Sequence, residues 1–361
     1  MSLRSYLRSL RKGRVVVAAI IVLVVGGTVA GVVISSGHPK PSANKVHHHT
    51  TPPLTKCPLT DLPAPGGKAP EREPLAVKIG NEPQGARPQS GLNEADIVYD
   101  TPAEGGIMRY LAVYQCETPS LVGPIRSVRW VDWHILEVFK HVELAFVAGI
   151  TPNRSEVESL PFIDDADAFL HAFAYQQSPD RQAPDATYAS AATLWRQFGH
   201  HAAPKPIFDY TTAPLPKGAR QAKDLAINFS GGTDVVWQWN SSTGQWVHTY
   251  SGATDIDALT NQPVTTTNII VQVVHYNLGP YNEDPEPQSG DVESQTLGTG
   301  KGWVLRNGEE IRVTWHRASL TSPTTYTSSR GQPVDLTPGR TWVEFVLDTT
   351  AKQPGAITFT P

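Results

Sequence analysis

The stretch GWVLRNGEEIRVTWHR, residues 302–317, sets the fold class of the chain. Two runs of alternating apolar and polar residues flank Asn307-Gly308, and Asn-Gly is a strong signal for a two-residue β-hairpin turn. Further strand-like runs lie on both sides of this hairpin, at DVVWQWN (234–240), QWVHTY (245–250), NIIVQVVHYN (268–277) and RTWVEFVLD (340–348). The sequence therefore predicts a mainly antiparallel β domain over residues 222–350.

The predicted β domain is rich in tryptophan. Six tryptophans fall within its strands: Trp237, Trp239, Trp246, Trp303, Trp315 and Trp342. A row of aromatic rings can serve as a ligand platform, but packing between strands is the commoner use of such residues. We therefore expect most of these rings in the core.

The chain before this domain mixes strands with helices. Short apolar runs bounded by Gly, Pro, Asn or Asp indicate strands at PLAVKIGN (74–81), ADIVYD (95–100), MRYLAVYQC (108–116) and ELAFVAGI (143–150). Apolar residues at near-helical spacing predict helices over 128–140 and 189–198. We expect an α+β fold, in which a mixed α/β domain over residues 74–212 precedes the β domain and residues 351–361 form a tail.

The first residues indicate a membrane anchor. Residues 1–14 contain no acid and five cations, and residues 15–34 contain no charge at all. At ~1.5 Å per residue such a helix spans about 30 Å, the thickness of the hydrocarbon layer, whereas the apolar core of a cleaved signal is usually shorter. The positive-inside rule places the basic tail in the cytoplasm. We expect a single-pass protein of the cell membrane, with one transmembrane helix and extracytoplasmic domains.

Residues 35–73 have the composition of a tether. They are interrupted repeatedly by proline and show no apolar period, which is typical of a semi-extended linker. His47, His48 and His49 are possible metal ligands, but consecutive residues in a linker do not present a fixed coordination geometry. The solvated-linker interpretation is favoured, and we predict no metal site.

The net charge of the chain is close to zero, so any charged binding site must be a local feature. The 361 residues are 39% hydrophobic, and 30 Lys and Arg balance 34 Asp and Glu to a net charge of -4. Nothing in this balance points to a nucleic acid as partner. The usual nucleophile-elbow, zinc-protease, phosphate-loop and dinucleotide motifs are absent from the sequence, so no cofactor is predicted.

Cys57 and Cys116 are the only cysteines. An even count in a chain exported to an oxidising compartment favours a disulfide between them. Two cysteines do not supply the four ligands of a structural zinc site, and a catalytic thiolate would have to survive oxidation. We predict one disulfide.

Candidate ligand residues gather near glycine and proline in the first domain. They are Arg87, Glu104, Arg109, Arg126, Arg129 and Arg181. Forked guanidinium groups beside turns are suited to carboxylates or phosphates of a ligand. An internal use is equally open, because Arg126 and Arg129 could instead form ion pairs with Glu104 or Asp100.

Several of these segments resemble the YerB-like lipoprotein family of Gram-positive bacteria, a two-domain envelope family chiefly of unknown function, and they look closest to its actinobacterial members. The resemblance spans nearly all of residues 57–346. The motifs that carry it are CPLTDLP (57–63), ARPQSGLNEADIVYD (86–100), EGGIMR (104–109), VYQC (113–116), VGPIRSVR (122–129), ASAATLW (189–195) and PGRTWV (338–343).

The chain departs from the family pattern at three polar positions. The family typically has Asp at the position of Gly80, Ser at that of Ala148, and a Pro-His-Asn run in place of Pro184-Asp185-Ala186. If the family used such a His and Asp for acid–base or metal chemistry, this chain would have lost a base and a ligand. A lipid-attachment cysteine is also missing after the apolar run, so the transmembrane helix takes the place of the lipid anchor.

Two functions remain open at this point. The first is a binding or scaffold protein of the bacterial cell envelope, which the resemblance links to cell-wall synthesis. Its partner would be an envelope protein or an anionic wall component. The second is an envelope hydrolase of a phosphodiester or wall polymer, with Glu104 or Asp185 as base. A carboxylate buried beside arginine is a good ion-pair partner and a poor base, so binding is favoured over catalysis.

Overall fold

The computed structural model describes residues 55–229, 233–282, 290–351 and 354–361. The predicted basic tail, the transmembrane segment 15–34 and His47 to His49 lie outside these residues. In the part that is described, no helix has the length and apolar character needed to cross a bilayer. The described residues belong to one compact unit.

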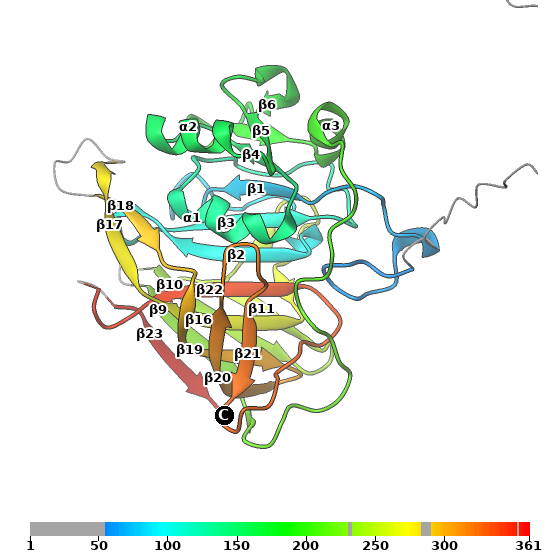
Figure 1. Cartoon of the computed structure of the whole chain (residues 1–361), viewed down its shortest axis with the longest axis vertical. Helices are drawn as coiled ribbons and strands as arrows, with labels where there is room; N and C mark the ends of the chain where they lie inside the picture. Colours follow the sequence, from blue (N-terminus) through cyan, green and yellow to red (C-terminus); the bar gives the residue numbers. More distant parts are fainter. Residues whose placement is uncertain (1–54, 230–232, 283–289, 352–353) are drawn as a thin grey trace, which may run out of the picture. The chain divides into compact units, whose positions relative to one another are not determined.

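An 11-stranded mixed sheet forms the centre of this unit. Its strands run, in spatial order, β21 (Thr325–Ser328), β20 (Glu309–Arg317), β19 (Gly298–Arg306), β16 (Asn268–Val274), β22 (Thr341–Leu347), β2 (Ile97–Pro102), β3 (Met108–Tyr114), β1 (Leu75–Ile79), β4 (Val142–Phe146) and β5 (Ile163–Asp167), with β8 (Arg220–Gln221) on β20. The helices are α1 (Trp130–Leu136), α2 (Thr151–Ser159) and α3 (Ala191–Phe198). Figure 1 shows them grouped around β1, β4 and β5, whereas the C-terminal half consists of strands.

A second sheet comes from the C-terminal half. It contains β12 (Ala253–Thr254), β11 (Gln245–Tyr250), β10 (Thr233–Asn240), β9 (Asp224–Phe229) and β23 (Ala356–Thr360), with β15 (Thr265–Thr266) on β11. Three short pairs complete the strands: β13 (Ile256–Asp257) with β14 (Gln262–Pro263), β17 (Tyr276–Asn282) with β18 (Gly290–Ser294), and β6 (Tyr175–Gln177) with β7 (Thr187–Ala189). The mixed α and β content confirms the coarse fold class.

The central strands are covered on both faces. Every residue of β1, β2 and β3 is buried, because alternate side chains enter two different apolar clusters. Val77 and Tyr110 belong to the cluster that also contains Trp237 of the second sheet. Ala76 and Leu111 belong to the cluster that contains residues of α1. Of the six tryptophans, four are buried and Trp239 and Trp303 are partly buried, which confirms their use in packing.

One pairing joins the two predicted domains. Strand β22 of the C-terminal half lies parallel to β2 of the N-terminal half, so Asp100 is the cross-strand neighbour of Glu344. The two halves therefore share a single hydrogen-bonded sheet. The domain limits at 74–212 and 222–350 stay a prediction.

Two segments differ from the predicted linker and tail. Residues from Thr55 to Glu73 fold onto the sheet, because Leu59 is fully buried and Cys57 is disulfide-bonded. Strand β23 forms within the predicted tail, because its backbone pairs antiparallel with β9. Folded structure thus extends beyond the predicted limits at both ends.

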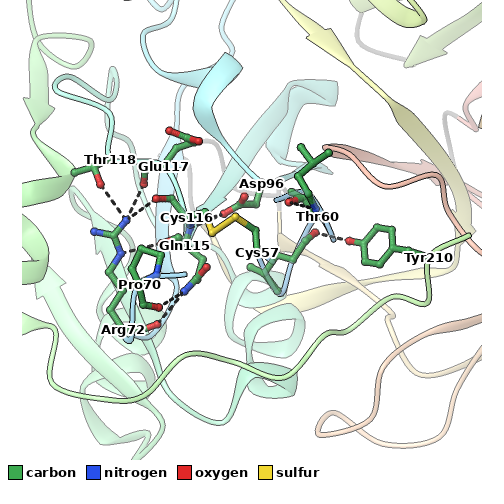
Figure 2. Close-up of a disulfide and its surroundings, with 12 residues drawn as sticks. Cys57, Thr60, Pro70, Arg72, Asp96, Gln115, Cys116, Glu117, Thr118 and Tyr210 are labelled. Atoms are coloured by element: carbon green, nitrogen blue, oxygen red, sulfur yellow. Dashed lines mark hydrogen bonds between the residues drawn. A yellow bond between two sulfur atoms is a disulfide. The ribbon is translucent and has the colours of Figure 1, made fainter. Parts of the chain in front are cut away.

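The predicted disulfide is confirmed between Cys57 and Cys116, 59 residues apart. Figure 2 shows it beside Arg72, whose guanidinium donates hydrogen bonds to the backbone oxygens of Gln115, Cys116 and Glu117. Asp96 accepts hydrogen bonds from the backbone nitrogens of Gln115 and Cys116. The disulfide therefore ties the end of β3 to the segment around Cys57, and hydrogen bonds tie it to Arg72 and Asp96.

Candidate functional site

The six predicted ligand residues do not converge on one open site. Arg109, Arg126, Arg129 and Glu104 belong to a row of buried ion pairs. Arg87 points into the interior, where it pairs with an aspartate. Arg181 borders an open pocket.

Glu82 is the centre of the buried row. Its Oε1 atom accepts hydrogen bonds from Arg109 Nη2 at 3.1 Å and from Arg126 Nη2 at 2.5 Å. Arg126 Nη1 also donates to Asp185 Oδ1 at 3.3 Å. Gly80 makes this arrangement possible, because a Cβ atom at that position would lie 2.8 Å from Arg126 Cγ. Gly80 therefore leaves room for the Arg126 side chain.

Arg129 forms the next pair, with Glu104. Its Nε and Nη2 atoms both lie 2.8 Å from Glu104 Oε2, and the two side chains are 6% and 7% exposed. This is one of the internal pairings that the sequence left open. Asp100, the alternative partner, lies instead beside Glu344. Arg129 also precedes helix α1, where its backbone N–H donates to Asp132 Oδ2, so the loop before α1 is held in place by these contacts.

The electrostatics of the row favour structure over acid–base work. Burial would raise the pKa of Glu82, but the charges of Arg109 and Arg126 lower it below the ordinary value. Burial would also raise the pKa of Glu104, but the charge of Arg129 outweighs burial and lowers it. Burial and then the charge of Arg129 lower the pKa of Arg109 to about 10. Glu104 is thus an ionised ion-pair partner and a weak base.

Arg87 contributes to a polar network between the two sheets. Its Nη1 lies 2.6 Å from Asp255 Oδ2, and its guanidinium stacks on the Tyr250 ring at 3.5 Å. The same Asp255 oxygen lies 3.0 Å from Nδ1 of His248, which is fully buried. Burial lowers the pKa of His248. The positive charge of Arg87 is therefore balanced inside the protein.

Asp100 and Glu344 form a second interior feature. Both are fully buried neighbours on β2 and β22, and Trp237 Nε1 donates a 2.7 Å hydrogen bond to Glu344 Oε1. Burial, followed by the nearby Glu344 charge, raises the pKa of Asp100 well above its ordinary value. Burial raises the pKa of Glu344 to about 7. Two neighbouring carboxyl groups that are both buried away from solvent retain at least one proton near neutral pH.

Arg181 lies on an open pocket of about 380 Å³, which we call the Arg181 pocket. The pocket is lined by Gly85, Arg87, Asp180, Arg181, Gln182, Ala183 and Asp185. Two backbone oxygens fix the guanidinium, since Nη2 donates to Pro88 O at 2.6 Å and Nη1 donates to Gly85 O. Among the described residues, no carboxylate lies within ion-pair distance of Arg181. A guanidinium has five N–H donors, so three remain for a ligand.

Asp185 connects the pocket to the buried row, because it lines the pocket and binds Arg126. Burial raises the pKa of Asp185, although the charge of Arg126 opposes the shift. Sequence reasoning named Asp185 as a possible base, but it missed Glu82 and Asp180 as neighbours of the arginines. The turn SPDR at 178–181 was the available signal for Asp180.

No three His, Cys, Asp or Glu side chains are arranged to hold a metal ion within the described ranges.

Comparisons with known proteins identify similar chains. The family model "Protein of unknown function (DUF3048) N-terminal domain" matches residues 59–203, and the model of the corresponding C-terminal domain matches residues 225–343. A relative from Bacillus subtilis (strain 168), described as "Putative lipoprotein YerB", is 26% identical over 306 residues, which cover 81% of this chain and 86% of the relative. The crystal structure of YerB protein from Bacillus subtilis superposes with a TM-score of 0.69 at 23% identity, over 84% of this chain and 99% of that one.

Proposed function

Because this chain belongs to the YerB-like two-domain family, we propose that it is a binding protein of the bacterial cell envelope that takes an anionic envelope component at the Arg181 pocket. The Arg181 guanidinium is the observation that carries this proposal. It is held by two backbone oxygens, borders an open pocket and has no carboxylate partner in the described part of the chain.

The proposed location outside the membrane has three supports. The uncharged run at 15–34 follows five cations, which favours a single-pass anchor with a cytoplasmic N-terminus. The Cys57–Cys116 disulfide is typical of an oxidising compartment. The similar Bacillus subtilis protein is described as a lipoprotein. A role in cell-wall synthesis would fit this location.

The hydrolase alternative gains less support from the geometry. Glu104 is bound by Arg129, which lowers its pKa, and Asp185 is bound by Arg126. The lowered pKa of Glu104 makes it a poor general base, and the Oδ1 atom of Asp185 already accepts a hydrogen bond from Arg126. We therefore place recognition, and not bond cleavage, at this pocket.

The test is binding to purified cell-wall sacculi. The full chain in mild detergent is sedimented with sacculi that retain their anionic polymers or have had them removed. Arg181→Ala should weaken binding about ten- to hundredfold, since each hydrogen bond to a charged group contributes ~1.5–3 kcal/mol. Arg196→Ala, an exposed arginine on α3, is the matched control and should bind like the wild type. The proposal fails if the wild type stays in solution or if the two variants bind equally.

A further inference from the structure

The charges around Arg181 restrict the kind of anion that the pocket accepts. Asp180 and Asp185 line the same pocket, one on the exposed surface and one buried. Arg87 also lines it, but the Arg87 charge is already balanced by Asp255. Asp185 is likewise paired with Arg126, so the charges of the pocket without an ion pair among the described residues are the Arg181 guanidinium and the Asp180 carboxylate.

A ligand that carries only negative charge would meet the negative charge of Asp180 and the partly compensated charge of Asp185. Like charges this close repel, and the pocket is open enough that this repulsion is screened but not abolished. Asp185 is partly compensated by Arg126 at 3.3 Å. The Asp180 side chain has no ion pair in the described ranges, so its charge is free to act on a ligand.

We propose that the ligand's head group is zwitterionic, with its phosphate or carboxylate on Arg181 and an ammonium group on Asp180. This inference rests on the proposed function and names its ligand class. Both protein charges lie next to each other in sequence and line one pocket, so the head group carries its two charges a few bonds apart.

A second pocket accommodates the remainder of the ligand. It has a volume of about 450 Å³ and shares both Asp180 and Arg181 with the first pocket. Its other polar lining residues are uncharged and include Gln176, Ser178 and Tyr188. Amide and hydroxyl groups both donate and accept hydrogen bonds, so neutral polar groups on the ligand fit this lining. Leu121, Pro179 and Ala258 line the same pocket, so the body of the ligand has both polar and apolar surface.

Calorimetry with three small probes tests the inference on the full chain in detergent. Phosphorylethanolamine carries both charges, glycerol 3-phosphate carries only the negative charge, and ethanolamine carries only the positive charge. We expect phosphorylethanolamine to bind about fivefold more tightly than glycerol 3-phosphate, which is the upper range for an exposed ion pair. Asp180→Asn should abolish that preference, and Arg181→Ala should abolish binding of both phosphates.

Glu117→Gln, an exposed carboxylate elsewhere, is the matched control and should leave the preference unchanged. Thermal unfolding of each variant shows whether the fold is kept. The inference is overturned if glycerol 3-phosphate binds as tightly as phosphorylethanolamine. It is also overturned if Asp180→Asn raises the affinity for both phosphate compounds by the same factor. If neither phosphate binds, the zwitterion inference fails, while sedimentation with sacculi decides separately whether the proposed function also fails.

Discussion

Arg126 illustrates how an arginine that looks exposed in sequence can be an internal ion-pair partner. Its neighbours Gly123 and Pro124 suggested a turn that presents it to a ligand, but its side chain bridges Glu82 and Asp185. Neither Glu82 nor Asp185 is close to Arg126 in sequence. The sequence therefore identified the charged group without identifying its partners.

Arg126→Ala is expected to destabilise the protein by about 3 kcal/mol, because it leaves Asp185 without its arginine and leaves Glu82 with Arg109 alone, in a largely buried site. Urea denaturation measures this effect, with Arg196→Ala as the exposed control. An unchanged denaturation midpoint together with lost binding to sacculi would instead make Arg126 a ligand residue.

The pair Asp100 and Glu344 predicts a pH dependence of stability. The folded pKa of Glu344, about 7, lies above the ordinary value of 4.5. Folded protein therefore keeps protons that the unfolded chain releases, and the stabilisation is full below pH 4.5 and is lost as pH rises through 7. We expect the titration of Glu344 to lower the free energy of unfolding by on the order of 3 kcal/mol over this window.

Glu344→Gln should flatten this part of the pH profile, because the amide cannot ionise and its oxygen can still accept from Trp237. Urea unfolding at about pH 5, 6, 7 and 8 spans the window of this titration and provides the comparison, with the exposed Glu71→Gln as control. Parallel profiles for wild type and Glu344→Gln would show that Glu344 is not the titrating group.

Among the secondary-structure elements, the hairpin at Asn307-Gly308 was predicted from its turn residues alone. Asn307 and Gly308 both have positive φ angles, 55° and 73°, as the predicted two-residue turn requires. The turn fixes the register of β19 and β20, in which Arg306 faces Glu309. Strand β23 was missed because its pairing with β9 is determined by a partner about 130 residues away and not by a local turn.

The disulfide belongs to this scale, because it closes a 59-residue loop that carries β1, β2 and β3. In the chain-entropy model such a loop stabilises the folded state by about 4 kcal/mol. Cys57→Ser with Cys116→Ser should lower the free energy of unfolding by that order. Guanidinium denaturation with and without reductant measures it, and the double variant should not respond to reductant. If reductant destabilised the wild type and the double variant equally, the stabilisation could not come from the disulfide.

For the whole molecule, the decisive contact is the parallel pairing of β2 with β22. Trp342 on β22 packs edge-on against Tyr110 of the N-terminal half at 5.1 Å and against Trp237 of the second sheet at 5.0 Å. No motif in the sequence announces this pairing, since its strands are about 240 residues apart. For this reason the two halves were predicted as separate domains.

The shared sheet predicts one cooperative unfolding transition. Separating the halves would expose the edge of β2 and the apolar face around Trp342, so neither half is expected to melt alone. Circular dichroism and tryptophan fluorescence should give coincident urea curves for the full chain. Two resolved transitions would show that the halves are independent.

The candidate site was only partly accessible to sequence reasoning. The sequence placed the guanidinium groups among turns, and Arg181 lines an open pocket, while its role as a ligand residue stays a prediction. It could not separate Arg181 from Arg126 and Arg129, because burial and partner choice follow from tertiary packing. Arg126 and Arg129 are paired with carboxylates, whereas backbone oxygens hold Arg181 and no carboxylate of the described residues lies within ion-pair distance of it.

Ligand recognition at the Arg181 pocket is tested most directly by a crystal structure of the protein soaked with phosphorylethanolamine. We predict density for the phosphate on Arg181 and for the amine on Asp180, with the ion pairs of Arg126 and Arg129 undisturbed. Density over the Arg109, Arg126 and Arg129 guanidinium groups, with Glu82 or Glu104 displaced and the Arg181 pocket empty, would contradict this prediction.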